Sequence, residues 1–499
     1  MSMVLNSEQR AIVKASKTAR TMRVVALAGT GKTSTLAEVA EANPYVQYLY
    51  VAYNKAAQLD AAARFPRNVK CQTSHGMVFM QYGKRYSSKL NAPRVPAWKA
   101  AKVLGLAELR VEYCVSCSMV TSEGGDHAGH AVLAETVNTT AMASLVMRGV
   151  DRWCHSDQAE IDWWHIPPVK GADERLQRAI RESLVSSARE AWKDLKSANG
   201  QLKFSHDMYL KMAQLDGWRT DRNSVMLDEA QDTNPCVASM LLSAKGKRMT
   251  MVGDPNQAIY EWRGATDAMD KFEADETLGL TGSYRFGPEI AEFANEWLGM
   301  LGSEMQLKGW KKLEGKVVDF VEEPDAILCR SNGGCVAAAM HWLEAGRKVA
   351  VVGGGGEIES LARGAQGLMA GRRSEHPDLV NFDSWGAVQA YCKEEPEAAG
   401  TLVPLVRAIS QYGPEAIMTM ARSLVPEDRA DVTVSTQHRS KGRQWKTVQI
   451  AGDVMQPKAG EELPREELRL SYVAATRAQD VLATGGDGGL GWIKGGLAT

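Results

Sequence analysis

The sequence lacks three features that would place it in a common class of protein. No apolar run approaches the length of a membrane span, and residues 1–6 (MSMVLN) lack the charged start and apolar core of a signal peptide. Net charge is nearly absent as well, at −1. We therefore expect an intracellular protein, in the cytoplasm or nucleoid, with no membrane partner. The balanced charge neither supports nor excludes a nucleic-acid partner, because such binding needs only a local basic and aromatic track.

Cysteine is also scarce, with eight residues scattered over a chain of 499. Scattered cysteines fit reduced thiols better than a disulfide framework. A chain of this length exceeds what one compact core can bury, so we expect several domains. The shares of hydrophobic residues (44%) and charged residues (24%) are ordinary for a globular protein.

Short β-rich runs alternate with helical patterns along much of the chain, and each run ends in polar or glycine residues. Such runs are typical of strands, and their alternation with helices predicts parallel sheets of the α/β class. The expected strands of a first lobe are residues 22–27, 47–52, 69–72, 224–227 and 248–252. Those of a second lobe are residues 317–321, 326–329 and 447–451.

Two segments interrupt this alternation, and we interpret them as insertions. Residues 86–204 are mostly helical in pattern and include Trp153, Trp163 and Trp164. Residues 346–430 include a glycine run at 353–356 and an acidic segment at 393–397. We therefore expect a first lobe of residues 1–85 and 205–283 that carries the insertion 86–204. A second lobe of residues 284–345 and 431–499 would carry the small insertion 346–430.

A glycine-rich turn joins the first expected strand to a helix, at residues 26–33 (ALAGTGKT). Backbone N–H groups in such a turn can hold phosphate, Lys32 would neutralise charge on the β- and γ-phosphates, and the Thr33 hydroxyl would hold Mg²⁺. Ala26 stands where the simple motif has its first glycine, so an ordinary strand-to-helix turn with a surface lysine is the alternative. The predicted nucleotide contacts in this loop are Ala28, Gly29, Thr30, Gly31, Lys32, Thr33 and Ser34.

Two acidic residues, Asp228 and Glu229, end another apolar strand. Asp228 would bind Mg²⁺ through water, and Glu229 would orient and deprotonate the attacking water. Alone, such a pair at a strand end is more often a solvated loop. Together with the phosphate loop it predicts an NTPase that uses ATP and Mg²⁺.

Further motifs follow in order along nearly the whole chain. They are residues 5–9 (LNSEQ), 52–57 (AYNKAA), 73–76 (TSHG), 253–264 (GDPNQAIYEWRG), 283–286 (SYRF), 326–332 (AILCRSN), 436–445 (TQHRSKGRQW) and 467–478 (ELRLSYVAATRA). With the phosphate loop, this series resembles the motifs of UvrD-like superfamily 1 DNA helicases, and most closely the helicase region of F-box DNA helicases. The resemblance implies two RecA-like P-loop lobes with parallel sheets, each carrying a mostly helical insertion, and an ATP-driven motor on single-stranded DNA.

The resemblance assigns several residues to the base and sugar of ATP. Gln9 would read the adenine edge, although Asn6 and Gln9 also fit a helix capping box, and both can be true. Tyr284 would stack on adenine. The motif at 436–445 adds Gly442 to the nucleotide site and places Gln444 where the family has a glutamate that bonds the ribose. Glutamine can still accept a hydrogen bond there, but it brings no charge.

Three more residues are assigned to the γ-phosphate. By resemblance, Gln257 senses this group, and Arg285 reaches it from the second lobe. Arg477 would act as an arginine finger in cis. An arginine on an amphipathic helix is usually solvated, so the role of Arg477 rests on its motif.

The resemblance also implies a track for DNA. Trp262 would stack on a base, which suits a motor because every base has a π-face. Both Trp262 and Tyr260 could instead be core aromatics, and His75 could be a structural histidine. The full set of predicted DNA contacts is Tyr53, Asn54, Lys55, Thr73, His75, Tyr260, Trp262, Arg263, Arg330 and His438.

A possible zinc site competes with a simpler interpretation. Cys114, Cys117, His127 and His130 have a spacing that could hold zinc. The two cysteines also fit one face of a helix, and the resemblance supplies no metal there. We therefore favour the helical interpretation.

We expect an ATP-dependent helicase or translocase that moves 3′ to 5′ on single-stranded DNA. Its substrates would be single strands and single/double-strand junctions in replication, recombination or repair, and the protein would be a monomer. The alternatives are the motor subunit of an ATP-dependent nuclease complex and an ATPase that strips protein filaments. We expect no appended nuclease domain, since few residues follow Arg477, and no preceding F-box, since the first motif starts at residue 5.

Overall fold

The structure is a computed structural model, and it describes residues 5–92, 95, 97–120, 126–169, 173–242, 247–260, 269, 272–374, 376, 378–379, 382–394, 402–457 and 461–495. Residues 111–120, 126–136, 394 and 494–495 are described by their backbone alone. The chain divides into two compact units. The first unit comprises Met1–Ala42, Met251–Ile259 and Glu273–Thr499, and the second comprises Asn43–Thr250 and Tyr260–Phe272.

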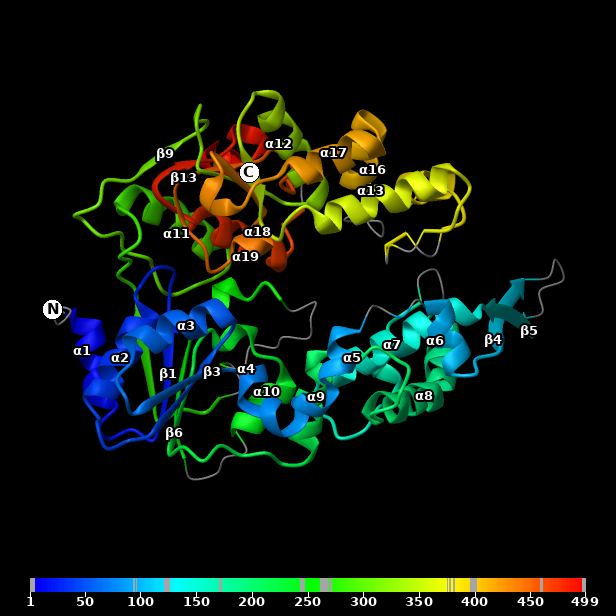
Figure 1. Cartoon of the computed structure of the whole chain (residues 1–499), viewed down its shortest axis with the longest axis horizontal. Helices are drawn as coiled ribbons and strands as arrows, with labels where there is room; N and C mark the ends of the chain where they lie inside the picture. The colour runs from blue at the N-terminus through cyan, green and yellow to red at the C-terminus, as the bar shows by residue number, and fades with distance from the viewer. Residues whose placement is uncertain are drawn as a thin grey trace. The chain divides into compact units, whose positions relative to one another are not determined.

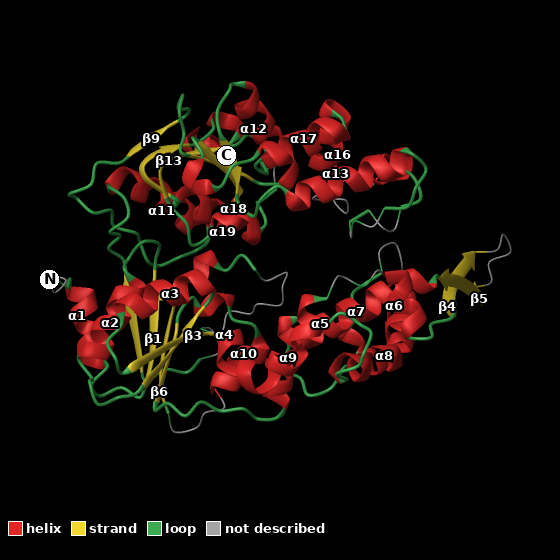
Figure 2. Ribbon diagram, viewed as in Figure 1, coloured by secondary structure: helices red, strands yellow, loops and turns green. Residues whose placement is uncertain are grey.

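Two six-stranded sheets account for most of the described strands (Figures 1 and 2). The first has the order β3-β2-β6-β7-β1-β8, with β1 (Thr21–Ala26), β2 (Tyr48–Ala52), β3 (Val69–Thr73), β6 (Ser224–Leu227), β7 (Arg248–Gly253) and β8 (Glu276–Leu280). The second has the order β11-β12-β10-β13-β14-β9, with β9 (Lys316–Val318), β10 (Ala326–Cys329), β11 (Val349–Val351), β12 (Val432–Thr436), β13 (Trp445–Ile450) and β14 (Ala478–Ala483). Two α/β sheets, as predicted, are therefore present.

The strand pairs are parallel, which explains why the strands are so apolar. β1 pairs with β8, β2 pairs with β3 and β6, and β10 lies between β12 and β13, all in parallel. Parallel strands are covered by helices on both faces and therefore read as nearly continuous apolar runs. All residues of β2, β6, β10 and β12 are buried.

Helices connect the strands of both sheets. In the first half of the chain they are α1 (Ser7–Ala15), α2 (Lys32–Glu41), α3 (Lys55–Arg64), α4 (Ser74–Val78), α5 (Ser87–Asn91), α6 (Ala97–Val103), α7 (Thr139–His155), α8 (Glu174–Lys196), α9 (His206–Leu215) and α10 (Pro235–Leu242). In the second half they are α11 (Pro288–Met300), α12 (Asn332–Glu344), α13 (Gly356–Met369), α14 (Trp385–Glu394), α16 (Leu402–Tyr412), α17 (Pro414–Ser423), α18 (Gln437–Ser440) and α19 (Arg465–Ala475). In the described part of the chain, no helix combines the length and apolar character needed to cross a membrane.

The segment 86–204 is mostly helical, as expected, but it also contains a β-hairpin that the sequence analysis missed. β4 (Leu109–Val120) and β5 (Asp126–Val137) pair antiparallel, and the ribbon extends beyond α6 and α8 (Figure 2). Cys114 and Cys117 lie on β4, so the helical interpretation of these cysteines was wrong. Their side chains, like those of His127 and His130, lie outside the described residues.

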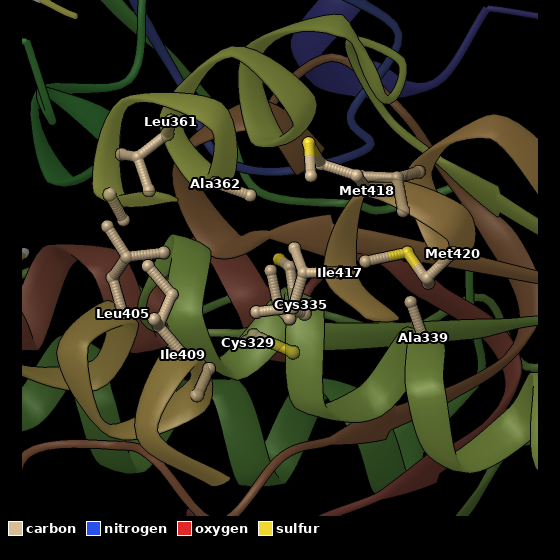
Figure 3. Close-up of a cluster of buried hydrophobic side chains, with 14 of the residues drawn as sticks. Cys329, Cys335, Ala339, Leu361, Ala362, Leu405, Ile409, Ile417, Met418 and Met420 are labelled. Carbon is tan, nitrogen blue, oxygen red and sulfur yellow. The ribbon is translucent and has the colours of Figure 1, made fainter. Parts of the chain in front are cut away.

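The second sheet has a hydrophobic core on each face, one with α12, α13, α16 and α17 and the other with α11 and α19. Figure 3 shows Cys329 from β10 and Cys335 from α12 in one cluster with Leu361, Ile409 and Ile417, which come from three further helices. β11 belongs to this core as well, through Val349 and Val351. Thus the start of the segment 346–430 contributes a strand to the second sheet. This packing holds β10 and β12, whose carboxyl ends lead into two of the predicted DNA motifs.

Candidate functional site

The loop after β1 has the backbone geometry of a phosphate-binding turn. Gly29 and Gly31 have φ angles of 74° and 77°, in the left-handed region that favours glycine. Gly31 is the N-cap residue of α2, so the helix begins at Lys32 and its first N–H groups lack partners within the helix. Such a terminus attracts anions. The other predicted phosphate contacts lie in the same turn or in the first turn of α2: Ala28, Thr30, Thr33 and Ser34.

The segment that begins the second lobe packs directly on this loop. A Cβ atom on Gly29 would lie 2.4 Å from Ser283 Oγ and 2.8 Å from Arg285 Cβ. The Tyr284 N–H donates to the carbonyl of Gly29 over 2.8 Å. Glycine at position 29 is therefore required both for the backbone angle and for this close approach.

The predicted adenine-side residues form a hydrogen-bonded group. Gln9 is fully buried, and its Nε2 donates to Thr35 Oγ1 over 3.1 Å. Tyr284 Oη donates to Gln9 Oε1 over 3.2 Å, and Asn6 Nδ2 donates to Tyr284 Oη over the same distance. Asn6 and Gln9 also form the predicted capping box at the start of α1. The edge of Trp310 lies near the Tyr284 ring, with the ring centres 5.6 Å apart.

A buried carboxylate, Asp254, links Gln257, the predicted γ-phosphate sensor, to the phosphate loop. Asp254 has no exposed surface, and Gln257 Nε2 donates to its Oδ2 over 2.7 Å. Tyr472 Oη donates to the same oxygen over 3.1 Å and accepts from the Ala28 N–H over 3.2 Å. Burial raises the pKa of Asp254, against the opposing effects of Lys32 and of its hydrogen-bond donors. A series of hydrogen bonds therefore connects Ala28 in the phosphate loop, through Tyr472 of α19 and Asp254, to Gln257.

The two predicted arginines are held by other parts of the same compact unit. Arg285 Nε donates to Gln444 Oε1 over 2.9 Å, and its Nη1 donates to the carbonyl of Thr476 over 2.8 Å. Arg477 is 1% exposed and donates to the carbonyl of Val473 over 2.7 Å and to Thr476 Oγ1 over 2.8 Å. Gln444 thus contacts an arginine. Gly442, two residues earlier, has a φ angle of 81°.

Asp228 and Glu229 lie in the other compact unit, at the end of β6. Tyr50 Oη donates to Asp228 Oδ2 over 2.6 Å, and the Glu229 N–H donates to Asp228 Oδ1 over 2.9 Å. Glu229 has a φ angle of 51°, a left-handed conformation that is uncommon for a residue other than glycine. Gln231 Nε2 donates to Glu229 Oε2 over 2.6 Å. Strain of this kind is concentrated at functional sites, which fits the predicted role of Glu229.

A cavity of about 540 Å³ collects several of the predicted DNA residues in the second unit. Tyr53 and Tyr260 stack beside it with ring centres 5.7 Å apart and planes inclined by 16°. Tyr53 is 41% exposed, so this pair is not a core contact. The cavity is also lined by Asn54 and His75. Of the other predicted DNA residues here, Lys55 is exposed at the start of α3, and Thr73 caps α4 by accepting from the Gly76 N–H.

His75 is paired with residues to which the sequence analysis assigned no role. Its Nε2 lies 3.1 Å from Asp207 Oδ1, and His155 Nε2 lies 3.2 Å from Asp207 Oδ2. Burial alone would raise the pKa of Asp207, but the two histidines outweigh it and hold the pKa well below its usual range. Asp207 is therefore ionised and shared by two imidazoles.

The remaining predicted DNA residues differ in their surroundings. Arg330 forms a bidentate ion pair with Glu467, which is 6% exposed, with Nε–Oε2 at 2.8 Å and Nη2–Oε1 at 2.5 Å. The ion pair raises the pKa of Arg330. His438 lies half-buried on α18. Trp262 and Arg263 lie outside the described residues.

Several residues of these networks were not predicted, among them Asp254, Tyr472, His155 and Asp207. Asp254 and Tyr472 stand within predicted motifs, His155 lies in the predicted insertion, and Asp207 lies in the expected first lobe outside the motifs, but a motif does not show which side chains meet. Asp254 and Tyr472 are 218 residues apart in the chain. The sequence signal that could have identified Asp254 is an acidic residue in a motif directly after an apolar strand.

Comparisons with known proteins agree with this geometry. The model of the UvrD/REP helicase N-terminal domain matches residues 174–276, and that of the UvrD-like helicase C-terminal domain matches residues 391–484. The chain is 28% identical to F-box DNA helicase protein 1 of Schizosaccharomyces pombe, over 95% of the chain and 56% of the relative. It is 27% identical to F-box DNA helicase 1 of Gallus gallus, over 96% of the chain and 48% of the relative. It is also 26% identical to the ATP-dependent DNA helicase UvrD2 of Mycobacterium bovis, over 52% of the chain and 46% of the relative.

The chain thus spans about half the length of the curated relatives that it matches most extensively. Both domain matches occur in the order expected from the motifs, and each contains strands of one of the two sheets. With the phosphate loop and the second-lobe residues packed on it, these matches show that the chain is similar to UvrD-like helicases in segments of both their N- and C-terminal domains.

Proposed function

We propose that this protein is an ATP-dependent DNA helicase or translocase that moves on single-stranded DNA. The observation that carries the proposal is the packing of Ser283–Arg285 on the phosphate loop at Gly29. It brings a residue of the second lobe, Arg285, beside the place where a phosphate would bind. A nucleotide held there would contact both RecA-like lobes, which is what a motor needs to convert hydrolysis into movement.

ATP would lie with its adenine against Tyr284 and Gln9 and its phosphates at the N-terminus of α2. Lys32 would bind the β- and γ-phosphates, and Gln257 would respond to the γ-phosphate through the Asp254 network. Arg285 and Arg477 would stabilise the charge that develops in the transition state. To do so, Arg477, which follows α19, must exchange the bonds that it makes to Val473, Thr476 and Arg443.

The residues predicted to hold Mg²⁺ both offer oxygen atoms as ligands. Thr33 offers a hydroxyl in the first turn of α2, and Asp228 offers a carboxylate that Tyr50 orients. Oxygen ligands of this kind are those that Mg²⁺ prefers, and bound Mg²⁺ neutralises charge on the phosphates. Glu229 would accept the proton of the attacking water.

The strand would lie on the second unit, along the stacked tyrosines and the cavity beside them. Stacking on aromatic rings holds any base, so a motor can move without reading the sequence. Tyr53 is exposed and its ring stacks on that of Tyr260, and both observations support this role. We retain the division of the chain into two lobes and two insertions at residues 86–204 and 346–430 as part of the proposal.

ATPase measurements with and without single-stranded DNA test this function. We expect hydrolysis that rises strongly when the strand is added. A rate of ATP hydrolysis that stays the same when single-stranded DNA is bound would contradict the proposed motor.

Direction and biological role need a separate assay. We propose movement from 3′ to 5′, in replication, recombination or repair, by a monomer. Partial duplexes with either a 3′ or a 5′ tail test the direction, and unwinding only from the 5′ tail would reverse it. Comparing strand separation with removal of a protein filament separates unwinding from stripping.

A further inference from the structure

The backbone at Arg330, directly after β10, is held by a carboxylate that follows β13. Asp453 Oδ1 accepts from the Arg330 N–H over 2.7 Å. Its Oδ2 accepts from the Ser331 N–H over 3.0 Å and from Ser331 Oγ over 2.8 Å. A Cβ atom on Gly334, at the start of α12, would lie 2.0 Å from the same oxygen, so the turn leaves room only for glycine. The point from which the Arg330 side chain leaves the sheet is therefore fixed.

The Arg330 guanidinium pairs with Glu467 in the first turn of α19. One edge of the guanidinium is filled by this pair, with Nε 2.8 Å from Oε2 and Nη2 2.5 Å from Oε1. Only 25% of the arginine side chain and 7% of the glutamate side chain are exposed. A buried carboxylate that loses its cation is left uncompensated, at a high cost in free energy. A DNA phosphate that took over this edge would therefore have to leave the charge of Glu467 buried and unpaired.

α19, which begins at this ion pair, carries several contacts of the nucleotide side. Arg469 Nη1 donates to the carbonyl of Ala258, the residue after the predicted γ-phosphate sensor, over 3.3 Å. Tyr472 Oη donates to Asp254 Oδ2 over 3.1 Å. Arg477, the predicted arginine finger, follows the last turn of the helix. Because a helix of this length moves as a rigid element, a shift of its first turn displaces all three of these side chains.

We propose that Arg330 is a positioning residue of the ATPase site and not a contact of the DNA strand, and that its ion pair with Glu467 holds α19 in the place that hydrolysis requires. This inference rests on the proposed function, and it differs from the role in DNA binding that the motif at 326–332 predicts for Arg330. The ion pair lies in the same compact unit as the phosphate loop, Gln257 and Arg477. Its effect on hydrolysis therefore does not require a bound strand.

The first test measures ATP hydrolysis without DNA by Arg330→Lys. Lysine keeps a positive charge beside Glu467, so the variant should fold, but its ammonium cannot form the bidentate pair. We expect kcat to fall about tenfold and KM for ATP to stay within about twofold, because a small displacement far from the chemistry slows the reaction without removing a ground-state contact. A normal kcat, or a rise in KM alone, overturns the inference.

Binding of a labelled single-stranded oligothymidylate to Arg330→Gln, measured over a range of salt concentrations, tests the strand contact. If Arg330 held a phosphate, its loss would lower the affinity and weaken its salt dependence by about one phosphate contact. We expect the affinity and its salt dependence to match those of the unmodified protein. A weaker salt dependence in this variant overturns the inference.

Glu467→Gln gives a second measurement, which does not need Arg330→Gln to fold. If Arg330 were a strand contact, removing the charge of its partner would free the guanidinium and tighten the binding of DNA. We expect unchanged affinity for the oligothymidylate, together with a kcat without DNA that falls as it does in the arginine variants. Tighter binding with a normal kcat overturns the inference.

A double-mutant cycle shows whether the two residues act as one pair. Arg330→Gln and Glu467→Gln should each lower kcat without DNA about tenfold, and the double variant should lose no more than either single variant. Losses that multiply to about a hundredfold would mean that the two residues act separately, and they would overturn the inference. Thermal unfolding measured beside each assay shows that the variant is folded.

Arg347→Lys is the matched control, at an arginine whose ion pair with Glu323 lies on the surface. The two side chains are 36% and 72% exposed, with Nη1 3.1 Å from Oε1. This variant should keep the kcat, the KM and the DNA affinity of the unmodified protein. If the unmodified protein hydrolyses no ATP, the proposed function itself fails. If it hydrolyses ATP and Arg330→Lys does so equally fast, only the positioning role of Arg330 fails.

Discussion

Around the phosphate loop the functional side chains are buried and bonded to one another, whereas those predicted to hold DNA stand half-exposed around a cavity. Asp254 has no exposed surface and Arg477 is 1% exposed, while Tyr53 is 41% exposed. The difference follows from what each region would bind. A nucleotide site gains from donors and charges fixed before reaction, in a place that water does not reach. A track for a moving strand must release each nucleotide, so its contacts stay open and individually weak.

The two regions also belong to different compact units. The nucleotide side, apart from Asp228 and Glu229, is contained in the first unit, and the tyrosine pair and the histidine cluster are contained in the second. Because few groups are shared, substitutions on one side should spare the binding function of the other. Loss of hydrolysis and loss of DNA affinity should therefore be separable.

The largest separation should come from Lys32→Ala. Lys32 would touch only phosphates, so hydrolysis should fall to background while affinity for single-stranded DNA stays near normal. Turnover by phosphate release and DNA binding by fluorescence anisotropy measure the two effects. Lys446→Ala, at an exposed lysine of β13, is the control and should retain both activities. Undiminished turnover in the Lys32 variant would contradict the assignment of the phosphate loop.

Arg285→Ala and Arg477→Ala should come next. Loss of an arginine that stabilises the transition state can cost about 10³-fold in turnover, with little change in ATP affinity. Single-turnover hydrolysis and binding of a fluorescent ATP analogue distinguish these two effects. Arg477 is buried, and its removal deletes hydrogen bonds to the carbonyl groups of Val473 and Arg443, at a cost of about 1–3 kcal/mol in the free energy of unfolding. Thermal unfolding of the variant should therefore be measured beside its turnover. If a folded variant fails to bind ATP, that arginine contributes to ATP binding and not only to the transition state.

The sequence predicted the parallel sheets because most of their strands are apolar runs with clear ends. β1, β2, β3, β6, β7, β10 and β13 all fall at or within two residues of their predicted positions, and β9 ends three residues earlier than predicted. β8, β11, β12 and β14 were missed, and in β8 (ETLGL) and β14 (AQDVLA) charged or glycine residues break the apolar pattern. The hairpin of β4 and β5 was missed because short polar residues in it also fit a helix. Two-stranded ribbons have little buried surface to mark them in a sequence.

The candidate site could be predicted only as far as its motifs reach. They name Gln257 and Arg477, but not the contact of Tyr472 with Asp254, which depends on how distant segments pack. Gln444 shows the same limit. Its sequence position suggested the ribose of ATP, whereas in the structure its side chain accepts from Arg285. Partners separated by more than a hundred residues follow from tertiary packing and not from local pattern.

On the strand side, Tyr53→Ala and Tyr260→Ala should have a smaller effect than the arginine variants. Stacking of one base on an aromatic ring contributes about 1–3 kcal/mol, so affinity for single-stranded DNA should fall roughly ten- to a hundredfold. ATP hydrolysis without DNA should persist, and a higher concentration of single-stranded DNA should be needed to stimulate it. Tyr53→Phe keeps the ring and serves as the control. If both alanine variants lose hydrolysis in the absence of DNA, the two regions are not independent.

The smallest expected effect concerns Gln444→Glu, which tests whether this residue serves the nucleotide side through Arg285 or through the sugar. Gln444 is exposed, and its Oε1 accepts from Arg285 Nε over 2.9 Å. A carboxylate would make this bond charge-assisted and hold Arg285 more firmly, so turnover should fall about threefold with little change in KM. If residue 444 instead contacts the ribose, the glutamate should lower KM for ATP and leave KM for 2′-deoxy-ATP unchanged. Measuring kcat and KM with both nucleotides separates the two roles, and a lower KM for ATP alone would return position 444 to the sugar.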